Sequence, residues 1–192
     1  SQYCNFYGVD YPFEIEIPVA TGQQVFTLRS LEYTVESFVA RNLNNCTDDF
    51  QILDYNFDEA IIWNTEQTSG LLRLNLQSKN NGIANLAYPI INPGFIDILY
   101  AKEEQKIRFN QFWDITDDRG EFNPIAQRQI WNTQPNGYLK TLNPNNLNYN
   151  KLQTQRKKFR HYINYVLLRK KVSGNVNMIL RSFNEKLQFS SR

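Results

Sequence analysis

The 192-residue sequence has few of the residues from which most metal sites and many catalytic centres are built. It contains one histidine, His161, and two cysteines, Cys4 and Cys46, which stand 42 positions apart. This set excludes an all-histidine metal cage and any zinc site with Cys₂His₂ or Cys₄ ligands. No stretch approaches the roughly 18 consecutive apolar residues of a membrane-spanning helix, so we expect no membrane segment. The sequence therefore predicts no catalytic residues, no metal ion and no cofactor.

The histidine and the cysteines have ordinary structural explanations. His161 lies in the cationic stretch 156–162, and no acidic residue is near it in the sequence. A lone histidine is more often structural than catalytic. Cys4 and Cys46 can pair only if the fold brings them together, and two unpaired thiols are the simpler expectation.

Alanine is also scarce, with seven residues, whereas asparagine and glutamine number 24 and 14. Alanine is the best helix former and asparagine favours turns, so this bias argues against a helical protein. Codon usage in an AT-rich genome is an alternative cause of the same bias. The Asn-rich segments 42–49, 78–86 and 143–150 are predicted to be loops.

Apolar and polar residues alternate along much of the chain. The alternation is clear in segments 13–17, 31–36, 72–77 and 106–110, and it is typical of strands with one face in a core. Turn residues between such runs predict four hairpins: 60–63 with the strand at Leu72, 98–101 with 107–112, 129–132 with 138–142, and 165–172 with 176–180. Residues 159–167 also have helical spacing, but their β-branched and aromatic side chains favour a strand. We therefore predict an all-β fold of antiparallel hairpins, forming a sandwich or barrel-like domain with few short helices.

Charge divides the chain, which has no flexible linker. Residues 1–150 carry 18 acidic and 10 basic side chains, and residues 151–192 carry 11 basic side chains and one acidic one. We expect one domain over 1–192, with an acidic β portion (1–150) and a basic C-terminal hairpin (151–192). The predicted subunit interface is a basic patch made of Arg156, Lys157, Lys158, Arg160, Arg169, Lys170 and Lys171. Such a patch can dock on an acidic face, either of the same chain or of a neighbouring copy.

Three other groups of residues have a functional and a structural interpretation. The basic segment 151–192 is interleaved with Tyr162, Tyr165 and Phe183, and cations with aromatic rings are also typical of single-strand nucleic-acid binding. The carboxylates of 114–121 resemble a calcium loop, but they lack its full spacing and include Arg119, so a solvated turn is favoured. Exposed tryptophans can stack on sugars, although core packing is the usual role; the candidates are Trp63, Trp113 and Trp131.

Several short stretches resemble a known family. They are 104–115 (EQKIRFNQFWDI), 119–121 (RGE), 147–151 (LNYNK), 156–162 (RKKFRHY), 172–175 (VSGN), 178–180 (MIL) and 190–192 (SSR). Together they resemble the C-terminal portion of the tail muzzle, nozzle or stabilisation proteins of crAss-like podoviruses. The matching stretches are scattered over about half of the chain, within 100–192, and include no catalytic signature.

The resemblance implies a β-rich structural virion protein in the tail of a short-tailed bacteriophage. Such a protein forms part of an oligomeric ring that closes the DNA exit channel. The implied partners are other copies in a symmetric ring, the upstream part of a precursor, other tail proteins and, transiently, phage DNA. The chain begins at Ser1. One explanation of this start is the routine removal of an initiator methionine. The alternative is that a longer precursor is cleaved at Ser1, in which case the chain is the C-terminal fragment of a larger protein.

The acidic and basic portions also favour a ring, because the basic portion of one copy can pack on the acidic portion of the next. Such head-to-tail contacts can close into a ring. The alternative function from another class is a β-sandwich module that binds carbohydrate or a host surface through its exposed aromatic residues. An enzyme is the least favoured class, because a usable set of acid, base and nucleophile is missing.

Overall fold

The computed structural model describes residues 5–6, 9–10, 12–40, 50–53, 55–77, 89–91, 95–115, 157–171 and 177–189. Within these residues every regular element is a strand and none is a helix, so the all-β prediction is confirmed. No helix long and apolar enough to cross a membrane occurs in the described part of the chain. In chain order the strands are β1 (Asn5–Phe6), β2 (Val9–Asp10), β3 (Phe13–Ala20), β4 (Phe26–Ala40), β5 (Phe50–Leu53), β6 (Glu59–Trp63), β7 (Leu72–Leu76), β8 (Ile90–Ile91), β9 (Ile96–Glu103), β10 (Lys106–Phe109), β11 (Arg160–His161), β12 (Ile163–Lys170) and β13 (Asn177–Phe189).

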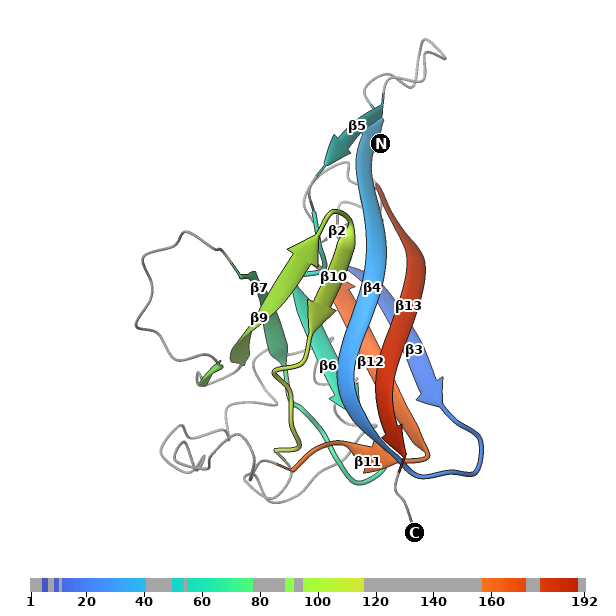
Figure 1. Ribbon diagram of the computed structural model, residues 1–192. Helices are drawn as coiled ribbons and strands as arrows, with labels where there is room; N and C mark the ends of the chain where they lie inside the picture. The colour runs from blue at the N-terminus through green and yellow to red at the C-terminus, as the bar shows by residue number, and fades with distance from the viewer. Residues whose placement is uncertain are drawn as a thin grey trace.

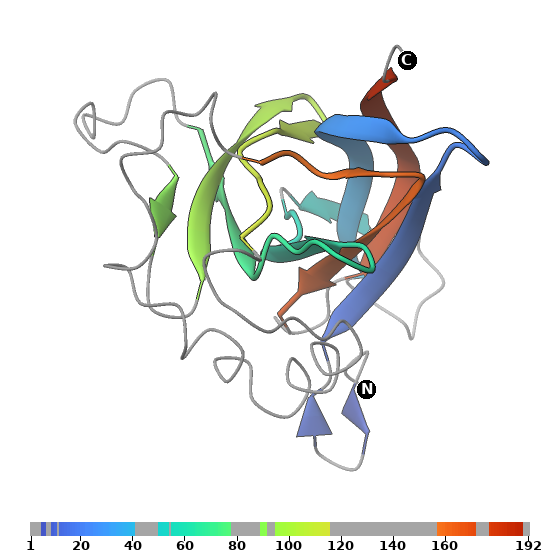
Figure 2. The same ribbon diagram turned by 90° about the horizontal axis from the view of Figure 1, so that it is seen from below.

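Eleven of these strands form one sheet, which curls into a nearly closed barrel (Figures 1 and 2). Around the barrel the order is β13-β4-β10-β9-β7-β6-β12-β3. The first and last strands of this series lie on the same side of the molecule in both views. No backbone ladder joins β3 to β13 in the described sheet, so the barrel wall has one seam between these two strands.

The longest strand, β4, organises one wall of the barrel. Along one edge it pairs in succession with β11, β10 and β5, and its other edge pairs with β13 over almost its whole length. The register with β13 shifts twice, once beside Arg29 and once beside Arg181. An extra residue at each bulge keeps the flanking apolar side chains on the core face. For this reason Leu28 and Leu31 are both buried although they are three positions apart.

Two predicted hairpins are confirmed and one is wrong. Strands β6 and β7 pair antiparallel, as do β9 and β10, whose turn places Glu104 in the left-handed region (φ 56°). The predicted hairpin 165–172 with 176–180 does not form, because both edges of β12 are occupied, by β3 and by β6, and β13 pairs with β4 instead. The hairpin 129–132 with 138–142 lies outside the described residues. The sheet is also mixed, since β7 and β9 pair parallel.

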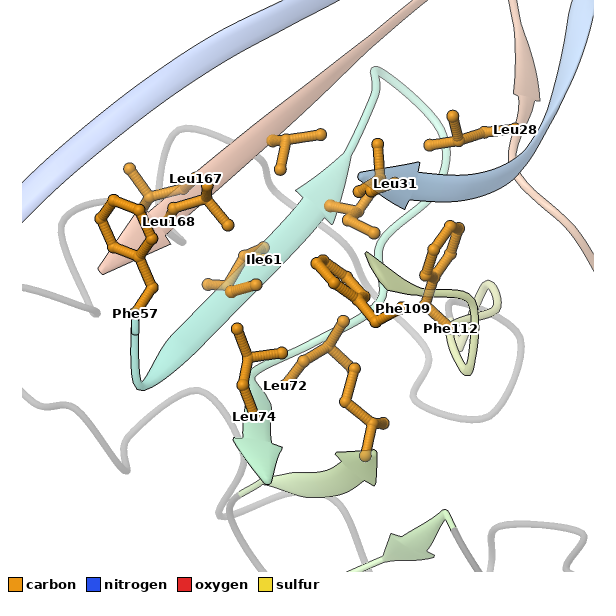
Figure 3. Packing of buried hydrophobic residues seen from close by; sticks show 14 of the residues in the cluster. Leu28, Leu31, Phe57, Ile61, Leu72, Leu74, Phe109, Phe112, Leu167 and Leu168 are labelled. Atoms are coloured by element: carbon orange, nitrogen blue, oxygen red, sulfur yellow. The ribbon is translucent and has the colours of Figure 1, made fainter. Parts of the chain in front are cut away.

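The core fills the inside of the barrel and draws on nearly every wall strand. Figure 3 shows side chains from β4, β6, β7, β10 and β12 packed against one another, among them Leu31, Leu72 and Phe109. Tyr33 is fully buried at its centre, in edge-to-face contact with Phe57 and Phe109. Its hydroxyl donates a 2.6 Å hydrogen bond to Asn56 Oδ1, and burial raises the pKa of Tyr33 well above its usual value.

The acidic and basic portions are interleaved in this one sheet. Strands β11, β12 and β13, from 151–192, pair with β3, β4 and β6, from 1–150. The segment predicted as a C-terminal hairpin therefore provides three strands on different parts of the barrel wall. Residues 159–167 contribute to β11 and β12, which confirms the strand interpretation of that segment over the helical one.

Candidate interaction surface

The basic residues at the end of β12 form ion pairs within the chain. Arg169 lies directly opposite Glu14 on β3 and opposite Glu59 on β6. Its Nε is 3.6 Å from Glu14 Oε1 and 3.9 Å from Glu59 Oε2. The Arg169 side chain is 12% exposed and that of Glu59 only 4%, so this pair is largely removed from water.

The next two lysines extend the same cluster. Lys170 Nζ is 2.8 Å from Asp58 Oδ1 and lies 5.1 Å from the centre of the Tyr55 ring. The backbone N–H of Lys171 donates to Asp58 Oδ2 at 2.8 Å, and its ammonium group pairs with Glu59. Three of the seven predicted interface residues are thus docked on acidic residues of their own chain. We name the set Glu14, Asp58, Glu59, Arg169, Lys170 and Lys171 the ion-pair cluster.

The remaining described cations of the patch precede β12, at its other end. Phe159 is fully buried between them and anchors the segment in the core. The carbonyl oxygens of Lys157 and Phe159 accept 2.9 Å hydrogen bonds from the N–H groups of Asp114 and Leu28. Lys157 and Arg160 are exposed, and Lys158 is half-buried. The backbone of this segment is therefore fixed, and the two exposed cations lie on the surface at this end of the strand. Arg156 lies outside the described residues.

A buried polar network, which sequence reasoning missed, holds that segment in place. The Gln67 side chain accepts from Arg160 N at 2.8 Å and donates to Lys158 O at 3.1 Å. It also accepts from Asn64, whose Nδ2 in turn donates to Asn164 Oδ1 at 2.9 Å. Asn164 is fully buried in β12. An asparagine within the largely apolar run 163–168 was the only sequence signal for this network.

The other candidate residues have structural roles where the structure describes them. His161 Nε2 lies 3.4 Å from Thr65 Oγ1, and the His161 ring packs on Tyr162 with centroids 4.2 Å apart. The Asp114 carboxylate accepts from Thr68 N at 3.2 Å and from Gln67 Nε2 at 3.3 Å. Among the described residues, no group of three or more His, Cys, Asp or Glu residues could hold a metal ion. The rest of the 114–121 loop, with Asp117, Asp118 and Glu121, lies outside the described residues, as do Ser1, Cys4 and Cys46.

The tryptophans differ from one another in their surroundings. Trp113 is buried in the core. Trp63 is half-buried and stacks on Tyr165, its register partner on β12, with ring centroids 5.6 Å apart. This pair lies on the opposite strand face from the core-facing Ile62 and Val166, because side chains alternate along a strand. Trp131 lies outside the described residues.

Comparisons with known proteins identify no family. No protein-family model matches the chain, and a search of curated proteins gives no match.

Proposed function

We propose that this protein is a structural subunit of the tail of a short-tailed bacteriophage, which acts by assembly and not by catalysis. In this proposal it forms part of the oligomeric muzzle or nozzle ring at the DNA exit channel of a crAss-like podovirus. Its partners are other copies of itself, the upstream part of a precursor and other tail proteins, with transient contact to phage DNA. Its location is the virion.

One observation carries the proposal. Three of the stretches that bear the resemblance fall on strands that all pair with β4: 104–115 contains β10, 156–162 contains β11, and 178–180 lies in β13. Stretches scattered over 77 positions of sequence thus contribute to one continuous wall of the barrel. A structural protein is expected to match its relatives in such packed strands, since its function depends on shape.

The charge distribution supports association between copies. The ion-pair cluster holds part of the basic segment against acidic residues of the chain, and Lys157 and Arg160 lie exposed at the other end of β12. Because the backbone of this segment is held in place, its exposed cations can bind an acidic face of a neighbouring copy of the chain. Contacts of this head-to-tail kind close into rings when the rotation between copies permits it.

Charge reversal tests the exposed cations before β12 separately from the cations of the ion-pair cluster. We expect the double variant Lys157→Glu/Arg160→Glu to weaken self-association at least tenfold, with a stability change of about 1 kcal/mol or less, because exposed charges contribute little to folding. The matched variant Lys170→Glu/Lys171→Glu changes the net charge equally, but it places anions against Asp58 and Glu59. It should lower the free energy of unfolding by about 2 to 4 kcal/mol.

Sedimentation velocity gives the association state of both variants, and urea unfolding followed by circular dichroism gives their stability. Unchanged self-association in Lys157→Glu/Arg160→Glu would show that this end of the barrel is not part of the interface between copies. Equal stability of the two variants would show that the ion-pair cluster does not support the fold.

A second candidate function is binding of a carbohydrate or host surface. The stacked pair of Trp63 and Tyr165 favours it, because half-buried aromatic rings on the outer side of a sheet can pack on sugar rings. This function does not need a symmetric assembly, so the mass of the native protein distinguishes it from the first proposal.

A further inference from the structure

The carboxamide of Gln67 joins three stretches of the chain that are far apart in the sequence. Its Oε1 accepts a 2.8 Å hydrogen bond from Arg160 N, and its Nε2 donates to Lys158 O at 3.1 Å. The same Nε2 also donates to Asp114 Oδ2 at 3.3 Å. One half-buried side chain of the β6–β7 connection therefore holds the backbone of segment 157–160, which leads into β12.

Asn64 determines the orientation of this carboxamide. Asn64 Oδ1 accepts hydrogen bonds from the backbone N–H groups of Glu66 and Gln67, at 2.9 and 2.8 Å, and these bonds fix its own amide group. Its Nδ2 then faces Gln67 Oε1 and donates to it at 3.0 Å. As a result Gln67 Nε2 faces a carbonyl oxygen, of Lys158, and a carboxylate oxygen, of Asp114. The site needs a donor at this atom, which glutamine has and an ionised glutamate lacks.

The network includes one feature that opposes stability. Asn64 Nδ2 also donates to Asn164 Oδ1 at 2.9 Å, and Asn164 is fully buried in β12. The Nδ2 atom of Asn164 has no hydrogen-bond acceptor among the described residues. A buried donor without an acceptor destabilises a fold, and an apolar residue at this position would avoid that loss. Departures from the most stable choice are expected at functional sites, and what this network positions is segment 157–160.

The segment also has backbone bonds to the rest of the barrel. Asp114 N donates to Lys157 O, and Leu28 N donates to Phe159 O, both at 2.9 Å. The side chains of Lys157 and Arg160 are exposed on this backbone. A charged group on a backbone that is already ordered loses less conformational entropy when it meets a partner than one on a loose segment. Order in this segment therefore favours any association that uses its cations.

We propose that Gln67 is a positioning residue for the interface between copies of the chain. Its carboxamide holds segment 157–160 in the conformation in which Lys157 and Arg160 meet the acidic face of a neighbouring copy. This inference rests on the proposed function and adds to it a residue that acts through the backbone of the basic segment. Loss of this support weakens association even when the cations themselves are unchanged, because more order must then be created on binding.

The isosteric variant Gln67→Glu tests this role in the full chain. At neutral pH its carboxylate cannot donate, and it lies against Asp114 and the carbonyl oxygen of Lys158. We expect self-association to weaken roughly tenfold in sedimentation velocity, and the amides of segment 157–160 to exchange roughly tenfold faster. Gln23→Glu, the same change at an exposed position, should alter both quantities less than about twofold. Slow exchange in β7 and β9 shows that a variant is folded, and the uncharged Gln67→Met replaces Gln67→Glu if the latter unfolds.

A lower pH separates positioning from a general loss of structure in Gln67→Glu. The introduced carboxyl group faces two acceptor oxygens, so its neutral form is favoured and its pKa is raised. As the pH falls through this pKa, the group gains an O–H donor and the defect that is present at higher pH is lost. We expect the dissociation constant to return to within about twofold of the wild-type value at about pH 5. Comparison with the wild-type protein at each pH removes the effect of the native titrating groups, His161 included.

Four results would overturn the inference. They are unchanged exchange in segment 157–160 of Gln67→Glu, equal losses in Gln67→Glu and Gln23→Glu, faster exchange with unchanged self-association, and no recovery of Gln67→Glu at low pH. The variant Lys157→Glu/Arg160→Glu distinguishes this failure from failure of the proposed function. If it weakens self-association and Gln67→Glu does not, the interface stands and the positioning role is wrong. If neither variant changes self-association, the proposed interface is wrong as well.

Discussion

Replacing Glu59 by alanine is expected to lower the free energy of unfolding by about 3 to 5 kcal/mol, the usual cost of removing one partner from a buried ion pair. Glu59 is 4% exposed and faces Arg169, whose own side chain is 12% exposed. Without Glu59 the guanidinium loses the more buried of its two carboxylate partners in the cluster, and the other, Glu14, is 26% exposed. The loss in stability arises because a cation held largely out of water is then less well compensated.

Equilibrium unfolding in urea measures this effect. Two graded controls accompany it: Glu14→Ala removes the more exposed partner and should cost about 1 kcal/mol, and Glu66→Ala alters an exposed turn residue and should change stability by less than about 0.5 kcal/mol. If Glu59→Ala and Glu66→Ala unfold at the same urea concentration, the ion-pair cluster contributes nothing measurable to the fold.

The second large effect is expected for Phe109→Ala, at about 3 to 5 kcal/mol, because the change opens a cavity where the wall meets the core. Phe109 is buried in β10 and makes edge-to-face contacts with Tyr33 at 6.4 Å and with Phe112 at 5.9 Å between ring centroids. Both contacts are lost together with the buried area of the ring.

Arg108→Ala is the matched control on the same strand. Arg108 is exposed and lies 3.4 Å from Glu32, so its loss should cost about 1 kcal/mol or less. Thermal and urea unfolding of both variants distinguish a packed core position from a surface one. A stability of Phe109→Ala equal to that of Arg108→Ala would contradict the burial of this strand in the barrel.

Local patterns in the sequence predicted the strands well. The alternation of Leu31, Tyr33 and Val35 with polar residues correctly assigns the core face of β4. Turn residues correctly located the β6–β7 and β9–β10 hairpins, because in these cases a single connection, 64–71 or 104–105, joins strands that are neighbours in the sheet. Each of these features is determined by residues close together in the sequence.

Long-range pairing could not be predicted in the same way. The turn residues between β12 and β13 correctly separate two strands, but a turn does not determine which edge each strand then occupies. β12 pairs with β3 and β6, which are far away in the sequence, and buries Val166 and Leu168 there. The parallel β7–β9 ladder follows from the same long-range packing, for which local periodicity gives no signal.

The candidate surface shows the same limit. The sequence located the basic segment but not its partners, since Lys170 meets Asp58 across 112 positions of chain. This segment divides into an ion-pair cluster and exposed cations because Arg169, Lys170 and Lys171 lie beside acidic residues of β3 and of the start of β6. Lys157 and Arg160 precede β12 and are exposed. Charge counting alone treats all these cations as equivalent.

Native mass spectrometry of the protein isolated from its source tests the assembly proposal most directly. We expect a symmetric complex whose mass is a whole-number multiple of the 22.7 kDa chain, with additional mass from any bound partner polypeptide. A free 22.7 kDa monomer over the whole accessible concentration range would contradict assembly as the function and would favour the binding module.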